Sequence, residues 1–77
     1  MTVMAAAWAK QRVLYALQEH TQLTQAQLVE KTEMSREMVR RAINALDEDG
    51  FIQEVEVLGE ALRWELTNDG EDEVVPP

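Results

Sequence analysis

The most regular pattern of apolar and polar positions lies in residues 24–52, TQAQLVEKTEMSREMVRRAINALDEDGFI. Apolar residues recur there every three or four positions, which is the spacing of one buried stripe on an α-helix. In the second half of the stretch, the stripe consists of Val39, Ala42, Ile43 and Leu46. The intervening polar residues fall on the opposite side. We therefore predict two consecutive helices, the second of which has one buried face and one exposed face.

Polar residues and a glycine mark the ends of these helices. Thr24 and Gln27 have the spacing of a capping box, in which each side chain satisfies a backbone amide of the first helical turn. Ser35 is a typical N-cap, and Gly50 is a typical residue to follow a last turn. Because only residues 32–34 separate the two patterns, we predict a helix, a tight turn and a longer helix that ends near Gly50.

The chain before this stretch has few helix breakers from Met1 to about His20, which predicts a long first helix. One apolar stripe on it consists of Ala6, Ala9, Val13, Ala16 and Leu17. Met4, Trp8 and Tyr15 lie almost opposite that stripe, so this helix is apolar on two faces. Two interpretations follow. Either Trp8 and Tyr15 pack under a returning C-terminal segment, or Met4, Trp8 and Tyr15 form a homodimer interface, because exposed aromatic patches are costly in water.

Two segments after Gly50 alternate apolar and polar residues, as half-buried strands do: residues 51–57 and residues 62–66. Residues 58–61 contain a glycine and would connect them as a hairpin. The apolar members of the alternation are expected to face the helices: Val55, Val57, Leu62, Trp64 and Leu66. The charged members are expected to face outward: Glu54, Glu56, Arg63 and Glu65. The short segment of residues 21–23 is read as a turn.

The composition limits the classes of function. A chain of 77 residues makes one small domain, and it contains no cysteine, so disulfides and thiolate metal sites are excluded and a cytoplasmic location is expected. No apolar run approaches the roughly 18 residues of a membrane span. His20, the only histidine, is expected to cap the end of the first helix, and no catalytic constellation or phosphate-binding glycine loop is present. We predict a protein without catalytic residues, metal or cofactor.

The net charge of −8 is distributed unevenly along the chain. Residues 1–46 hold six basic and four acidic residues, a net charge of +2, whereas residues 47–77 hold one basic and eleven acidic residues, a net charge of −10. The last part, residues 69–77, is rich in acids, ends in two prolines and is expected to be a disordered tail. A basic surface suited to phosphates is therefore expected only in the first half.

The paired helices of residues 24–52, together with the segment LTNDG at residues 66–70, resemble the multiple-antibiotic-resistance regulator (MarR-like) family of winged helix-turn-helix proteins. In that family an LT-x-x-G segment follows the wing. The resemblance covers about residues 10–70 and implies an α+β, mostly helical fold. That fold is a winged helix-turn-helix of three helices and a small β-hairpin wing, which would occupy residues 1–68. It also implies a short strand at residues 21–23.

The same resemblance implies sequence-specific binding of double-stranded DNA, with the second helix of the pair as recognition helix in the major groove. In that groove arginine forms paired hydrogen bonds with guanine, and asparagine does so with adenine. Hydroxyl and basic groups at the start of a helix bind phosphates. The candidate DNA-binding residues are Lys31, Ser35, Arg36, Glu37, Arg40, Arg41 and Asn44. An alternative remains open. Glu37 has the spacing for an ion pair with Arg41, and Glu33 is within reach of Arg36 or Arg40, so these arginines would then only solubilise the helix.

The predicted wing departs from the family pattern, because its tip, LGEA at residues 58–61, carries no basic residue. Glu54, Glu56 and Glu65 frame this tip, so the wing is expected to be repelled by phosphates. The first function that we consider is a small, dimeric DNA-binding transcriptional regulator in which DNA contact is confined to the helix. The second is a protein-binding module or inhibitor that does not bind DNA and whose acidic wing contacts a basic protein partner.

Overall fold

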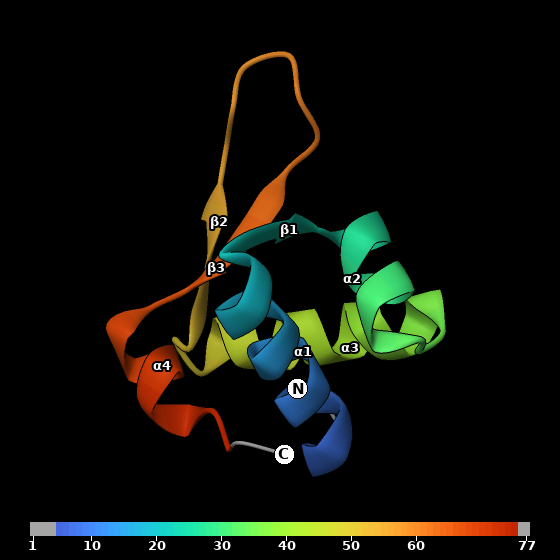
Figure 1. The fold of residues 1–77 in the computed structure, drawn as a ribbon, viewed down its shortest axis with the longest axis vertical. Helices are drawn as coiled ribbons and strands as arrows, with labels where there is room; N and C mark the ends of the chain where they lie inside the picture. The colour runs from blue at the N-terminus through green and yellow to red at the C-terminus, as the bar shows by residue number, and fades with distance from the viewer. Residues whose placement is uncertain (1–4, 76–77) are drawn as a thin grey trace.

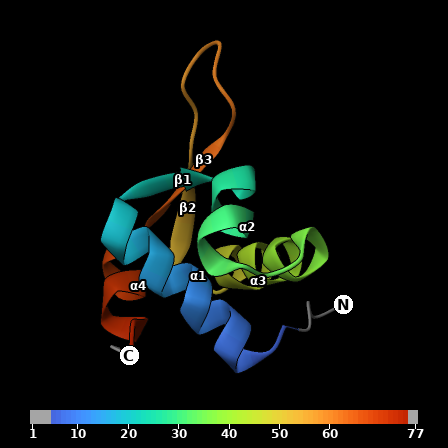
Figure 2. The same cartoon turned by 45° about the vertical axis from the view of Figure 1, so that its right-hand side comes forward.

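The computed structural model describes residues 5–75 and contains helices on one side of a small antiparallel sheet, from which a long hairpin projects (Figure 1). Figure 2 shows the same hairpin extending away from the helices in a second view. The elements follow in the order α1 (Ala7–His20), β1 (Gln22–Thr24), α2 (Gln25–Thr32), α3 (Arg36–Glu48), β2 (Ile52–Val55), β3 (Arg63–Leu66) and α4 (Asn68–Glu73). The fold class predicted from the sequence, a mostly helical winged helix-turn-helix with a hairpin wing, is confirmed.

One apolar core lies between α1, α2, α3 and the sheet. All four residues of the predicted α3 stripe are buried, and Val39 and Ala42 have no exposed surface. The α1 stripe is confirmed for Ala9, Val13, Ala16 and Leu17, which are buried with Leu14, a residue that we had not assigned to it. Ala6 instead precedes the helix and is exposed. The predicted start of this helix at Met1 lies outside the described residues, and α1 begins at Ala7.

The beginnings of α2 and α3 match the capping signals. The Gln27 amide donates to Thr24 Oγ1 at 3.1 Å and Gln27 Oε1 accepts from the Thr24 amide at 2.9 Å, which completes the predicted capping box. Ser35 Oγ accepts from the Met38 amide at 3.2 Å at the start of α3. These local bonds fix where each helix begins, so the polar residues that open α3 are held at a defined position.

The buried hydroxyl of Thr32 forms two hydrogen bonds with the backbone at the turn between α2 and α3. Thr32 Oγ1 donates to the Leu28 carbonyl at 2.6 Å and accepts from the Met34 amide at 3.4 Å. Glu33 ends α2 in the left-handed conformation, with φ 58°, which is unfavourable for a residue with a side chain. The two helices are thereby fixed relative to each other.

The sheet has the order β1, β3, β2, so the central strand is the second strand of the wing. Leu23 of β1 pairs with Trp64 of β3, and both are buried. Residues 22–24 therefore form the short strand that the family resemblance implied, whereas the pattern of the sequence alone had indicated a turn. On the outer face, Glu65 accepts hydrogen bonds from Gln22 on one side at 3.0 Å and from Gln53 on the other at 2.6 Å.

The predicted faces of the wing are partly wrong. Val55 pairs with Arg63, whereas Glu54 pairs with the buried Trp64. Residues directly opposite each other point to the same face of a sheet, so Glu54 and not Val55 shares the face of Trp64. Leu62 was expected to face the helices but is 38% exposed. Ile52, near the base of the hairpin, provides the buried side chain of β2.

The segment after the wing forms α4, so the prediction that the chain is disordered from Asp69 is wrong for residues 69–73. Thr67 Oγ1 accepts from the Gly70 amide at 3.0 Å and donates to the Gly50 carbonyl at 2.7 Å. The Thr67 amide donates to the Phe51 carbonyl at 3.0 Å. A Cβ atom on Gly70 would lie 1.8 Å from the same Phe51 oxygen. The threonine and the glycine of the LT-x-x-G segment therefore attach α4 to the chain that follows α3.

Candidate nucleic-acid interface

The seven candidate residues lie at the end of α2 and along the outer face of α3. Lys31 is in the last turn of α2, Ser35 is the N-cap of α3, and the others follow on α3 itself. All seven are exposed: Lys31, Ser35, Arg36, Glu37, Arg40, Arg41 and Asn44. The buried stripe of α3 turns the opposite side of this helix outward, so its five candidates share one exposed face. Lys31 lines a hollow with residues of α1.

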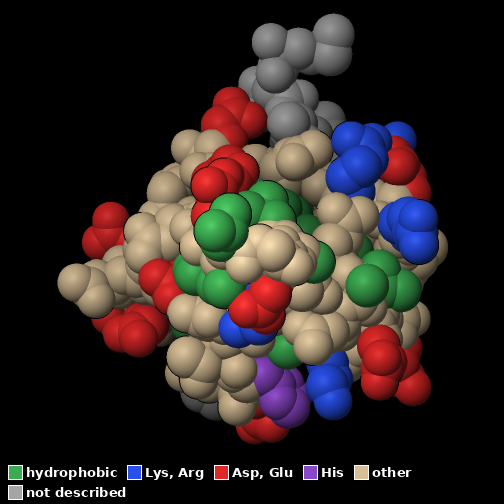
Figure 3. Space-filling view, turned by 90° about the horizontal axis from the view of Figure 1, so that it is seen from above, with side chains coloured by type: hydrophobic (Ala, Val, Ile, Leu, Met, Phe, Trp, Pro, Cys, Tyr) green, Lys and Arg blue, Asp and Glu red, His purple; other side chains and the backbone are tan. Residues whose placement is uncertain are grey.

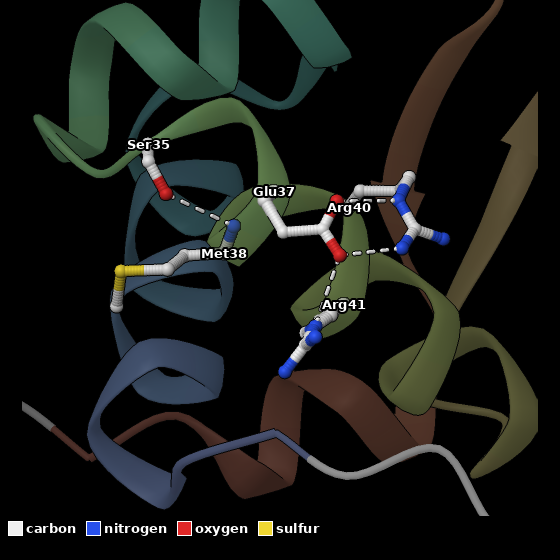
Figure 4. A network of polar contacts seen from close by, with 5 residues as sticks. All are labelled: Ser35, Glu37, Met38, Arg40 and Arg41. Carbon is white, nitrogen blue, oxygen red and sulfur yellow. Dashed lines mark hydrogen bonds and ion pairs between the residues drawn. The ribbon is translucent and has the colours of Figure 1, made fainter.

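Glu37 is bonded to two of the three arginines on α3, Arg40 and Arg41 (Figure 4). Its Oε1 accepts from Arg40 Nη2 at 2.6 Å and from Arg41 Nε at 3.0 Å, and its Oε2 accepts from Arg40 Nε at 3.1 Å. The predicted ion pair between Glu37 and Arg41 is confirmed, and Arg40 joins the same carboxylate. In residues 5–75 the alternative pairing of Glu33 with Arg36 or Arg40 is not formed.

The two arginines keep Glu37 ionised. Hydrogen bonds from Arg40 first, and then from Arg41, lower the pKa of Glu37 from 4.5 to about 2. The same contact raises the pKa of Arg40. All three side chains remain more than half exposed, so the contact has little effect on stability and its main effect is on where the charges lie. At neutral pH the group carries two positive charges and one negative charge.

The remaining polar groups at the start of α3 are of the kinds that bind anions. Ser35 is engaged as a cap, and Arg36 is the first residue of the helix. Unpaired amides at a helix N-terminus carry a partial positive charge, which adds to the charge of nearby basic side chains. Asp47, Glu48 and Asp49 lie at the opposite end of the same helix. The helix is therefore positive where it begins and negative where it ends.

The wing is acidic and has an apolar tip. Leu58 is fully exposed at 102%, and Glu54, Glu56 and Glu60 are exposed around it. Glu60 forms an ion pair with Arg63, the only basic residue of the hairpin. Figure 3, which looks onto the molecule from above the wing, shows hydrophobic side chains beside acidic ones near the centre, and most of the visible Lys and Arg side chains toward the right. The basic surface and the wing are separate features.

Trp8 and Tyr15, two of the residues predicted for a dimer interface, have different surroundings in the structure. Trp8 is 53% exposed, and the Arg12 guanidinium carbon lies 5.5 Å from the centre of its ring, a cation–π contact. Tyr15 is half-buried and donates to Glu19 Oε1 at 3.0 Å, a hydrogen bond that raises its pKa. Met4 lies outside the described residues.

The C-terminal segment returns to α1, but its described part, up to Val75, does not cover Trp8. Gln11 Nε2 donates to the Glu73 carbonyl at 2.8 Å, and the Val75 amide donates to Gln11 Oε1 at 2.9 Å. Tyr15 and Val75 line a shared hollow of about 450 Å³, whereas Trp8 is outside it. The interpretation that Trp8 packs under the returning segment is therefore wrong, and its exposed ring is left on the surface of α1.

Arg12 has a role that the sequence analysis did not assign. Its Nη1 donates to the Thr32 carbonyl at 3.1 Å, at the end of α2, while its guanidinium lies over Trp8. The spacing of four residues between Trp8 and Arg12 was a signal for the ring contact. The contact with Thr32 depends on the packing of two helices and has no local signal. Arg12 thus connects α1 to the turn that precedes the candidate interface.

Within residues 5–75, no helix combines the length and the apolar composition that a membrane crossing requires. The same part of the chain contains no group of three or more acidic or histidine side chains suited to a metal ion.

A helix-turn-helix that is followed by a β-hairpin defines the winged-helix class of domains. The sequence profile of the family described as winged helix-turn-helix DNA-binding matches residues 9–53. This match spans more than half of the 77 residues, and the chain belongs to the winged helix-turn-helix DNA-binding family. A comparison with curated protein sequences gave no significant match.

Solved structures with the same fold include a regulator of the family that the sequence resembles. A mutant of ZitR from Lactococcus lactis in apo form superposes with a TM-score of 0.78 and 24% identity, over 86% of this chain and 51% of that chain. NMB1585, a MarR family regulator from Neisseria meningitidis, superposes with a TM-score of 0.75 and 24% identity, over 84% of this chain and 47% of that chain. The chain therefore spans about half the length of these structures, and the likeness shows the fold.

Proposed function

We propose that this chain binds double-stranded DNA sequence-specifically as a transcriptional regulator, with α3 in the major groove. The observation that carries the proposal is the outer face of α3, where Arg40, Arg41 and Asn44 are exposed on one helix. These residue types make the bidentate contacts that distinguish guanine and adenine. Membership of the winged helix-turn-helix DNA-binding family supports the same assignment.

Three further residues are assigned to the DNA backbone. Lys31, Ser35 and Arg36 lie around the start of α3, where a phosphate would meet basic side chains and helix amides together. Such contacts fix the orientation of a protein on the duplex and strengthen binding to all sequences alike. Glu54, Glu56 and Glu60 on the wing oppose phosphates, so we confine the contact to the helix-turn-helix.

We also propose that the protein acts as a homodimer, in the cytoplasm and without catalytic activity. The exposed Trp8 supports an interface on α1, with Tyr15 and Met4 as the other predicted members. A two-fold dimer would place two copies of α3 in successive major grooves, about 34 Å apart. A second contact compensates for an acidic wing, because two linked weak contacts bind more tightly than one.

The test is the salt dependence of binding to duplex DNA. Fluorescence anisotropy of labelled random-sequence duplexes, between about 50 and 200 mM salt, should show an affinity that falls steeply as salt rises. A sequence selected from a random duplex library should then bind more tightly than the unselected pool. A wild-type protein that binds no duplex at the lowest salt would refute the proposal.

A second candidate function, a protein-binding module, is supported by the tip of the wing. A fully exposed leucine between acidic side chains fits a basic protein surface with an apolar recess. Replacement of Glu56 and Glu60 by lysine separates the two functions. For a DNA-binding protein, the double reversal should tighten non-specific binding and steepen its salt dependence. For a protein-binding module, it should slow association with the basic partner, while duplex binding is absent in the wild type.

A further inference from the structure

Glu37 is an acidic side chain in the middle of a surface proposed to contact phosphates and bases. An unpaired carboxylate there would weaken binding to any DNA sequence, because it repels the backbone. Glu37 is not unpaired, since its two oxygens accept three hydrogen bonds from Arg40 and Arg41.

The carboxylate takes the inner edge of each guanidinium group and leaves the outer edge unoccupied. Arg40 uses Nε and Nη2, and Arg41 uses Nε, so neither Nη1 group takes part in the contact. In Figure 4 the outer nitrogens of both arginines point away from Glu37. The Nη groups of an arginine are donors that can pair with O6 and N7 of guanine. Both arginines can therefore still donate from Nη1 to a base while Nε donates to Glu37.

Holding an arginine before it meets DNA changes the entropy of binding. A free arginine side chain samples many rotamers, and this freedom is lost when it pairs with a base. When Glu37 already restricts the side chain, less entropy remains to be lost on binding. The same carboxylate removes part of the positive charge that would attract any phosphate. It therefore disfavours non-specific contact and favours a well-aligned base.

We propose that Glu37 is a positioning residue that sets sequence specificity by holding Arg40 and Arg41 with their outer edges toward the bases. This role rests on the proposed DNA-binding function. Glu37 lies in the first turn of α3, and the arginines follow three and four positions later, so one carboxylate reaches both. The residue lowers the affinity for random DNA and raises the ratio of specific to non-specific affinity.

The experiment compares Glu37→Gln with a matched control on the same helix. Glu48→Gln removes the same charge from an exposed residue at the other end of α3, where no ion pair is formed within residues 5–75. Both variants and the wild type are titrated against the selected duplex and against random duplexes. Glu37→Gln should bind random duplexes more tightly and reduce the affinity ratio at least about five-fold, the lower end of one bidentate base contact. Glu48→Gln should leave the ratio unchanged.

Glu37→Asp provides a second variant that keeps the charge and the acidic first turn of α3. Its shorter side chain loses the reach to both arginines, so the ratio should fall while the affinity for random duplexes does not rise. A double-mutant cycle then locates the effect. In the background Arg40→Ala with Arg41→Ala, the substitution Glu37→Gln should no longer change the ratio, because Glu37 has nothing left to position.

Each contrary result has a separate meaning. An unchanged ratio in Glu37→Gln, with tighter binding to random DNA, would show that Glu37 is only a repelling charge. An effect that persists without both arginines would show that Glu37 acts on DNA directly. Either result overturns the positioning role and leaves the proposed function intact. A wild type that binds no duplex at low salt would refute the proposed function and, with it, this role.

Discussion

The close approach of Gly70 to the Phe51 carbonyl gives the strongest stability prediction. Gly70 lies inside α4, where helix propensity alone would make alanine more favourable than glycine by about 1 kcal/mol. The structure predicts the opposite sign. A Cβ atom at this position would lie 1.8 Å from the Phe51 oxygen and 2.8 Å from the Phe51 carbonyl carbon. Both neighbours are backbone atoms, so no side chain can rotate to relieve the clash.

The size of the effect follows from what must move. Separating α4 from Phe51 strains a packed contact, which costs about 1–3 kcal/mol. It also weakens the hydrogen bonds of Thr67 to Gly50 and Phe51, each worth about 0.5–1.5 kcal/mol. After the gain in propensity is subtracted, Gly70→Ala should lower the free energy of unfolding by about 1–5 kcal/mol. For a domain of this size, the melting temperature should fall by about 4–8 °C for each kcal/mol.

Urea and thermal unfolding followed by circular dichroism measure this difference. Asp72→Ala is the matched control, because it introduces the same side chain at an exposed position of the same helix and should change stability by less than about 0.5 kcal/mol. A Gly70→Ala protein that is as stable as the wild type, or more stable, would refute the attachment of α4 through Thr67 and Gly70.

Three further predictions concern the turn, the surface of α1 and the pH dependence. Glu33→Gly should raise the free energy of unfolding by about 1 kcal/mol in urea titrations, because glycine adopts the positive φ of 58° without steric cost; a loss of stability would contradict this. Trp8→Glu should convert a dimer into a folded monomer in sedimentation equilibrium, since an unpaired charge would be buried in the interface. A wild-type protein that is monomeric at high concentration would refute the proposed dimer interface on α1. The folded pKa of Glu37 is lowered to about 2, so its contact with the arginines, which adds little stability at this exposed site, is complete above the unfolded value of 4.5 and is lost as the pH falls toward 2. NMR titration of its carboxyl group checks this value, and a midpoint near 4.5 would show that the contact with the arginines does not form in solution.

The parts of the fold that depend on neighbours in sequence were predictable. The capping residues Thr24 and Ser35 bond to amides of the next turn, and the α3 stripe repeats with the period of the helix. The pairing of Glu37 with Arg41 has the same origin, because positions four apart lie side by side on a helix. The exposure of the five candidates on α3 could therefore be predicted from sequence alone.

The parts that depend on distant segments were not predictable. Alternation in residues 51–57 shows that neighbours point to opposite faces, but not which set meets the core. The core includes Ile52, which places Glu54 across from Trp64 and leaves Val55 on the other face. The acidic residues after Thr67 indicated disorder, yet α4 is held by hydrogen bonds to Gly50 and Phe51. Arg12 reaches Thr32 only because α1 packs beside α2.

The measurement that tests the central proposal most directly compares arginine and lysine variants on selected and random duplexes. Arg40→Ala and Arg41→Ala should each weaken binding to the selected duplex by about 1–3 kcal/mol and relax the preference at one base position. Lys31→Ala should weaken binding to all sequences equally and reduce the salt dependence by about one phosphate contact. Equal and very small effects of all three substitutions, or a wild type with no duplex affinity at low salt, would contradict the assignment of α3 as a DNA-reading helix.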